Sequence, residues 1–133
     1  MDAADVEQAL VTGLTALAPE AAAIWLFGSV ARGTAGQGSD VDVAVLVGRD
    51  LPRTLDGFPF ELQAALQRLV RREVQLIVLD EAPPDLAHRV LRDGHLVYER
   101  DRSARIAFEI KSRNEYFDLL PILLEYRRAR RTA

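Results

Sequence analysis

The stretch from Phe27 to Val47 reads FGSVARGTAGQGSDVDVAVLV and decides the fold class. It begins at the end of a short apolar run, residues 24–27, and finishes in a second one, residues 41–47, so we expect two buried strands. The loop between them, residues 28–39, contains four of the eight glycines of the chain. Such a density of glycine indicates backbone that adopts unusual angles or approaches another group closely.

Outward from this stretch, the hydrophobic spacing predicts alternating helices and strands. We expect helices over residues 2–18, 60–71, 83–93 and 103–119, and further strands over residues 74–79 and 95–99, the last at a sheet edge. Pro121 either kinks the final helix or begins a separate one. This order is typical of a small α/β or α+β domain with helices mainly on one face of the sheet and a C-terminal helix.

Single residues carry further expectations. Trp25 is expected in the core of the first strand. Ser103 is expected to be the N-cap of the last long helix, with Ile106, Ile110 and Phe117 on its inner face.

Composition excludes several classes of protein. The 133 residues are 49% hydrophobic, which predicts one folded domain over residues 1–133 and excludes disorder. The absence of cysteine excludes a disulfide scaffold, thiol catalysis and cysteine-ligated zinc. No apolar run approaches the roughly 20 residues of a membrane span, and the N-terminus is acidic, unlike a signal peptide. We therefore expect a cytoplasmic protein without membrane contact.

Charge is distributed unevenly along the chain. Residues 1–99 carry 8 basic and 15 acidic side chains, whereas residues 100–133 carry 9 basic and 5 acidic ones. A basic C-terminal helical segment after an acidic body fits nucleic acid, an acidic protein partner or a solvated helix face.

Two short motifs within the opening stretch carry the chemistry. Gly28 and Ser29 follow a strand directly, and a strand–Gly-Ser–helix turn aims backbone N–H groups and a hydroxyl at one point, as phosphate-binding loops do. Asp40 and Asp42 are two residues apart, which places carboxylates on one face of a strand. Such a pair repels unless a cation joins it, and Mg²⁺ with phosphate co-ligands fits best. The other interpretation is a solvated acidic pair at a strand end.

The pattern Gly-Ser-x10-Asp-Val-Asp resembles the nucleotidyltransferase fold of the DNA polymerase β superfamily. The chain is more closely similar to the minimal nucleotidyltransferases that act as antitoxins beside HEPN-domain ribonuclease toxins. Residues 81–101 and 116–126 add to this second resemblance.

The resemblance implies a site and a substrate. Gly28 and Ser29 would hold the β- and γ-phosphates of ATP, and Asp40 and Asp42 would be the catalytic aspartates that ligate two Mg²⁺ ions. Arg32 either reaches the triphosphate or pairs with a carboxylate. The superfamily has a third carboxylate on the next strand, where this chain has Gln75, which brings no charge and cannot act as a base. Glu73, two residues earlier, is either a substitute ligand or a solvated residue at the strand end.

Three functions follow from this pattern. In the first, the chain transfers AMP from ATP to a tyrosine of a cognate HEPN toxin, an all-helical protein, and so neutralises it. In the second, Gln75 has weakened catalysis and the antitoxin acts by occlusion, through residues 100–133 in a hetero-oligomer with the toxin. The third is nucleotidyl transfer to a small molecule. With the antitoxin resemblance, the basic tail becomes a candidate surface for a protein partner, and direct binding of nucleic acid is not favoured.

Overall fold

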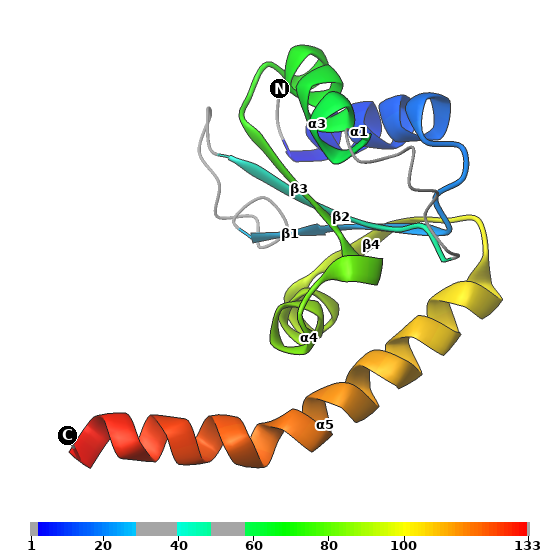
Figure 1. Cartoon of the computed structure of the whole chain (residues 1–133). Coiled ribbons are helices and arrows are strands. Elements are labelled where there is room, and N and C mark those ends of the chain that lie inside the picture. The colour runs from blue at the N-terminus through cyan, green and yellow to red at the C-terminus, as the bar shows by residue number, and fades with distance from the viewer. Residues whose placement is uncertain (1–2, 29–39, 49–57, 133) are drawn as a thin grey trace.

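The computed structural model describes residues 3–28, 40–48 and 58–132 (Figure 1). Its elements are, in chain order, α1 (Ala3–Leu17), β1 (Ala23–Phe27), β2 (Val41–Leu46), α3 (Phe58–Val70), β3 (Val74–Val78), the short 3-10 helix η2 (Leu79–Glu81), α4 (Pro84–Asp93), β4 (His95–Glu99) and α5 (Arg102–Thr132). The order of helices and strands expected from the sequence is confirmed, with boundaries that shift by one or two residues apart from the longer α5.

The four strands form one mixed sheet in the order β3-β2-β1-β4. β1 pairs antiparallel with both β2 and β4, whereas β2 and β3 run parallel. β4 lies at a sheet edge, as expected from the sequence, and its residues are half-buried or exposed. This topology places the end of β1 beside the beginnings of β2 and β3.

Helices cover both faces of the sheet (Figure 1). α1 and α3 pack on one face through a buried cluster that includes Leu10, Leu66 and Val43. α4 and the first turns of α5 pack on the other face around Trp25, which is 3% exposed, and Leu46. The α+β class is thus confirmed, but the helices are divided between two faces and are not gathered mainly on one. The cause is that β1 and β2 are apolar at nearly every position, so both faces must be shielded from water.

The C-terminal helix is a single element of 31 residues with Pro121 in its interior. Of the two alternatives for this proline, the structure therefore shows the first. Proline lacks the N–H that would bond to the carbonyl four residues earlier and its ring crowds that carbonyl, so a helix bends there. Figure 1 shows α5 changing direction in its second half and projecting beyond the body. None of the helices in the described ranges combines the length and hydropathy that a bilayer span requires.

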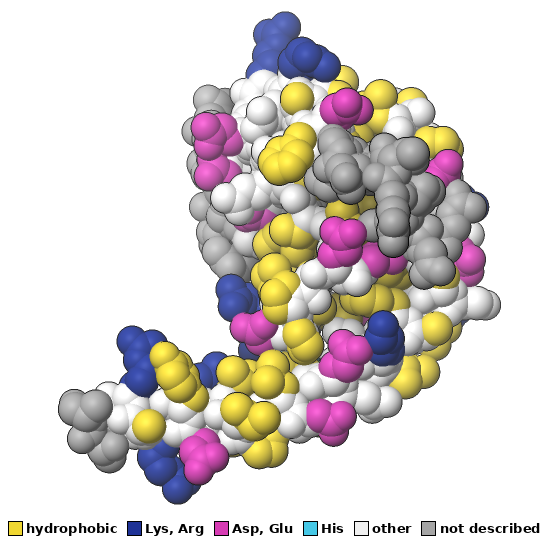
Figure 2. Space-filling model, in the orientation of Figure 1, with side chains coloured by type: hydrophobic (Ala, Val, Ile, Leu, Met, Phe, Trp, Pro, Cys, Tyr) yellow, Lys and Arg dark blue, Asp and Glu magenta, His cyan; other side chains and the backbone are white. Residues whose placement is uncertain are grey.

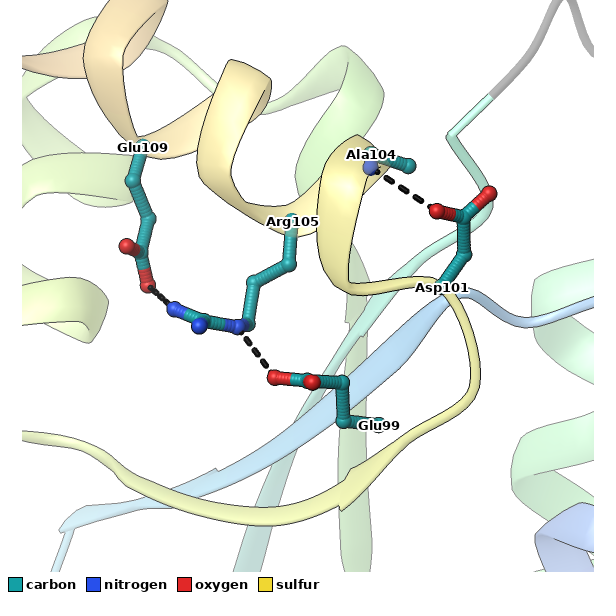
Figure 3. A network of polar contacts seen from close by, with 5 residues as sticks. All are labelled: Glu99, Asp101, Ala104, Arg105 and Glu109. Carbon is teal, nitrogen blue, oxygen red and sulfur yellow. Dashed lines mark hydrogen bonds and ion pairs between the residues drawn. The ribbon is translucent and has the colours of Figure 1, made fainter.

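Polar contacts fix the first turns of α5 to the body (Figure 3). Asp101 Oδ1 accepts a hydrogen bond of 3.0 Å from the backbone N–H of Ala104, so Asp101 caps the helix and the expected cap, Ser103, lies within it. Arg105 donates to Glu109 Oε1 at 2.8 Å and to Glu99 Oε2 of β4. These hydrogen bonds, with Glu109 the larger influence, raise the pKa of the Arg105 guanidinium above its ordinary value.

The inner face of α5 differs from the expected one. Ile106, Ile110 and Phe117 are 40%, 47% and 56% exposed, so they point outward. The inner side is formed instead by residues that include Phe108, which packs on the second core cluster, and the buried Ser112. The expectation failed because the side facing the body carries polar residues, so that hydrophobicity alone selects the wrong face.

Candidate functional site

The backbone turns sharply at Gly28, directly after β1. This glycine has φ of +74°, in the left-handed region that residues with a side chain rarely adopt. A Cβ placed on Gly28 would overlap Oδ2 of Asp42 and lie 3.1 Å from its Cγ. Both the conformation and the space therefore require glycine here, and they bring the backbone of the turn against a carboxylate.

Asp42 is the second residue of β2 and lies opposite Phe27 of β1 in the antiparallel register. Its neighbour Val41 is fully buried in the cluster under α1 and α3, so the alternation of a strand turns the Asp42 side chain to the face covered by α4 and α5. Asp42 is half-buried there, whereas Asp40 is exposed immediately before the strand. The two aspartates thus stand at the start of β2, on the edge of the sheet reached by Gly28.

Gln75 is the direct neighbour of Asp42 on β3. The two residues are Cα partners in the parallel ladder, where adjacent strands lie about 4.8 Å apart. Gln75 is exposed, and as the register partner of Asp42 it shares the same face at the rim of the sheet. A carbonyl oxygen at this position is a weak, uncharged ligand that adds nothing to the negative charge of the aspartates.

Glu73 is exposed and immediately precedes β3. Its carbonyl oxygen accepts a hydrogen bond of 2.8 Å from the Val41 N–H, which holds the two backbones together at the start of the parallel pair. Within the described ranges, no three side chains of His, Cys, Asp or Glu are grouped so that they could hold a metal ion.

The donor set at this edge consists of two carboxylates and a glycine turn. Oxygen ligands of this kind suit Mg²⁺, which is usually held by one or two carboxylates together with substrate phosphates. Asp40 and Asp42 therefore fit the ion that the sequence led us to expect, provided that a phosphate completes its coordination. The remaining predicted site residues, Ser29 and Arg32, lie outside the described residues.

Asp80, in η2, was missed by the sequence reasoning. Its two carboxylate oxygens accept hydrogen bonds from the backbone N–H groups of Val47 at 2.8 Å and Gly48 at 2.9 Å. The clamp fixes the far end of β2, opposite the edge that carries Asp42. The only signals for it in the sequence are an acidic residue just after β3 and a glycine just after β2, and neither reveals their proximity.

Comparison with known proteins shows which family the chain resembles in sequence and in structure. The model of the family described as polymerase beta, nucleotidyltransferase, matches residues 13–103, and no curated protein matches the chain by sequence. Among solved structures, a chain of a toxin–antitoxin complex with AMP-PNP has a TM-score of 0.72 and 24% identity, over 90% of this chain and 97% of that one.

Two further structures extend the comparison. A chain from the complex of tri-AMPylated Shewanella oneidensis HEPN toxin with MNT antitoxin has a TM-score of 0.69 and 21% identity, over 93% of this chain and 98% of that one. A structure assigned as a minimal nucleotidyltransferase has a TM-score of 0.57 and 30% identity, over 71% of this chain and 95% of that one. The resemblance expected from the Gly-Ser and Asp-Val-Asp motifs is confirmed, and since the family model spans more than half of its length, this chain belongs to the polymerase β nucleotidyltransferase family.

Proposed function

We propose that this chain is an antitoxin that transfers AMP from ATP to a tyrosine of a cognate HEPN ribonuclease toxin and thereby neutralises it. The observation that carries the proposal is the contact of Gly28 with Asp42 at the edge of a nucleotidyltransferase sheet. The neighbouring structures support the choice of substrates, since one contains AMP-PNP and another a tri-AMPylated HEPN toxin with its MNT antitoxin.

In the proposed reaction, phosphate binding and Mg²⁺ binding fall to different residues of the chain. The turn at Gly28 and Ser29 holds the β- and γ-phosphates through backbone N–H groups, with Arg32 as a candidate second contact. Asp40 and Asp42 hold Mg²⁺, which when bound supplies charge neutralisation on the phosphates. The strand register and the close approach of the Gly28 backbone support this role, because they place the Asp42 carboxylate against the turn.

The proposed reaction is a simple displacement. The tyrosine oxygen forms a bond to the α-phosphorus of ATP, the bond from that phosphorus to the bridging oxygen breaks, and pyrophosphate leaves. The phenolic proton passes to water. Catalysis of this kind rests mainly on positioning and electrostatic stabilisation, which a small sheet edge with two carboxylates and a phosphate turn can supply.

We further propose that residues 1–133 act as a single nucleotidyltransferase domain. In this domain α5 contacts the partner protein, and the edge of the sheet binds the nucleotide. The helix is joined to the sheet by the Arg105 bridge to Glu99 and by the packing of Phe108. A cytoplasmic location, where ATP and Mg²⁺ are abundant, agrees with this role.

One observation favours a second candidate function. Gln75 places an amide where a third carboxylate would stand beside Asp42, and the described residues contain no group of three acidic or histidine side chains fit for a metal. A site weakened in this way would leave neutralisation by binding and occlusion of the toxin. The two functions differ in whether the toxin changes mass.

The experiment is to incubate the chain with ATP, Mg²⁺ and the protein encoded by the neighbouring gene, and then to measure the intact mass of that protein. We expect added AMP units that disappear in Asp42→Asn and Asp40→Asn. Asp85→Asn is the matched control, because Asp85 is an exposed aspartate of α4 at the opposite end of β3. Neutralisation of the toxin without any mass change, unaffected by both site variants, would establish occlusion instead.

A further inference from the structure

The outer face of α5 carries an apolar stripe that nothing in the described chain covers. Ile110, Phe117 and Leu124 follow one another at intervals of seven residues and are 47%, 56% and 53% exposed. Ile106, 40% exposed, extends the stripe toward the body by one helical turn. Figure 2 shows hydrophobic side chains along this arm, between charged ones. A heptad interval of large apolar residues is the spacing at which one helix packs along another.

A cavity of about 420 Å³ opens beside the middle of this stripe, between α4 and α5. It is lined by His88 and Leu91 of α4 and by Ser112, Arg113 and Phe117 of α5, together with other charged side chains of both helices. Ser112 is 2% exposed, and its hydroxyl finds no hydrogen-bond partner within the described part of the chain. Buried hydroxyls are almost always satisfied, so this one points to a polar group supplied from outside.

The charge around the stripe selects the chemistry of the occupant. Arg113 lies on the cavity wall, and Arg127, Arg130 and Arg131 are exposed near the end of the helix. Asp118 and Glu125, both exposed, follow Phe117 and Leu124 on the other border of the stripe. A surface with apolar residues at heptad spacing, guanidinium groups on one border and carboxylates on the other is complementary to a helix whose apolar face is flanked by acidic residues on one side and basic residues on the other.

The solved structures similar to this chain include part of α5, and one of them is a chain of a toxin–antitoxin complex. A match over 90% of 133 residues leaves about 13 residues unmatched, fewer than the 31 residues of α5, so the chain from the AMP-PNP complex necessarily shares part of this helix. The family model, in contrast, stops at residue 103, where α5 has barely begun. The arm is therefore an addition to the nucleotidyltransferase core that recurs in a chain taken from a toxin–antitoxin complex.

The direction in which α5 projects gives a functional reason for docking on this helix. Figure 1 shows the second half of α5 projecting toward the side of the molecule where β1 ends and β2 begins, which is the side of Gly28 and Asp42. A protein held along the arm is thereby held on the side of the candidate site.

We propose that the outer face of α5, formed by Ile106, Ile110, Phe117 and Leu124 with the Ser112 cavity beside it, is the surface on which the acceptor protein docks one amphipathic helix with an acidic border facing Arg113 and a basic border facing Asp118 and Glu125. This inference rests on the proposed function, because it takes the HEPN toxin as the acceptor. Docking along α5 presents the acceptor tyrosine to the nucleotide held at the sheet edge, so the arm sets which protein is modified.

The test compares Leu124→Asp and Phe117→Asp with Phe60→Asp. Phe60 is the matched control, since it is 76% exposed on α3, on the opposite face of the sheet. Binding of each variant to the purified protein of the neighbouring gene is measured by calorimetry, and circular dichroism shows that each variant is folded. We expect both α5 variants to bind at least about tenfold more weakly, as loss of a central apolar anchor does, and Phe60→Asp to bind within about twofold of the wild type.

The outcomes separate the inference from the function on which it rests. If the wild type binds the neighbouring protein and both α5 variants bind it equally well, the docking surface lies elsewhere and the proposed function stands. If the α5 variants abolish only self-association of the chain, measured by light scattering, the face is an interface between two copies and the inference is wrong. If the wild type does not bind the neighbouring protein at all, the proposed function fails and the inference with it.

Discussion

Gly28 and Asp42 approach so closely that one added carbon atom on the glycine would overlap the carboxylate. Thirteen residues lie between them in the sequence, yet the antiparallel register of β1 and β2 sets Phe27 opposite Asp42 and leaves Gly28 immediately beyond. The contact couples a turn suited to phosphate with a carboxylate suited to a cation. The space between them is too small for a side chain on residue 28, so the geometry of the candidate site requires glycine at this position.

Gly28→Ala is therefore expected to affect both stability and activity. A non-glycine residue at φ of +74° costs about 1–2 kcal/mol in the free energy of unfolding. The methyl group must also displace the Asp42 carboxylate, and a misplacement of about 1 Å at a reacting centre can lower the rate by about a hundredfold. Thermal unfolding measures the first effect, and the rate of AMP addition by intact mass measures the second.

Gly48→Ala is the control for this variant. Gly48 has φ of +85°, and a Cβ there would lie 3.2 Å from the Cβ atoms of Ala22 and Ala104, at the other end of β2. We expect a similar loss of stability with AMP transfer retained when the assay is run well below the unfolding temperature. Equal loss of transfer in both variants would show that general destabilisation, and no local displacement of Asp42, is the cause.

Gln75→Asp restores a carboxylate beside Asp42. Because Gln75 is exposed and in register with Asp42, the change is expected to alter stability by less than about 1 kcal/mol. A third charged oxygen strengthens binding of Mg²⁺, so we expect AMP transfer to reach half of its maximal rate at an Mg²⁺ concentration at least about tenfold lower. A titration of the rate with Mg²⁺ measures this. An unchanged Mg²⁺ dependence would mean that position 75 does not face the metal.

Glu73→Gln tests whether another carboxylate replaces the missing one. The described residues contain no three-membered group of acidic or histidine side chains around a common point, so we expect the rate of AMP transfer to stay within about twofold of the wild type. Asp40→Asn, measured in parallel, is expected to abolish transfer. A loss in Glu73→Gln comparable with that in Asp40→Asn would identify Glu73 as the third ligand.

The hydrophobic pattern was enough to predict the strands, the helices and their order, because α1 buries apolar residues at helical spacing and β1 and β2 are short, almost continuous apolar runs. It failed on α5, where Arg105 and Ser112 face the body and Ile106 and Ile110 face away. Arg105 lies inward because Glu99 of the preceding strand meets it there, and a contact between a strand and a helix is invisible to the pattern of either one alone.

The candidate site, like the fold, could be predicted from the sequence only in part. The motifs predicted that Gly28, Asp40 and Asp42 belong to one site, since each residue type fits phosphate or cation chemistry. Their proximity, however, is set by strand register: Gly28 contacts Asp42 only because β1 and β2 pair without a shift at this end. Gln75 likewise becomes a neighbour of Asp42 through the parallel ladder, which no local pattern specifies.

Arg105→Gln is expected to loosen the base of α5. The guanidinium, whose side chain is 16% exposed, bridges Glu99 and Glu109 (Figure 3), and its loss leaves two partly buried carboxylates without their cation. We expect the free energy of unfolding to fall by about 1–2 kcal/mol, or the midpoint of thermal unfolding to fall by about 4–8 °C. Lys111→Gln is the matched control, because the pair of Lys111 with Glu115 spans 3.9 Å on the exposed side of the same helix and contributes little.

The difference in stability between the wild type and Arg105→Gln is expected to fall only at high pH. Since the hydrogen bonds to Glu109 and Glu99 raise the pKa of Arg105 in the folded state, the stabilisation is fully present below the pKa of the unfolded chain and is lost only as the pH rises through the folded value. Both values lie far above neutrality, so the gap in stability between wild type and Arg105→Gln should stay constant from about pH 7 to about pH 10. Chemical denaturation at several pH values measures the gap, and a gap that closes within this interval would show that a group other than the guanidinium carries the effect.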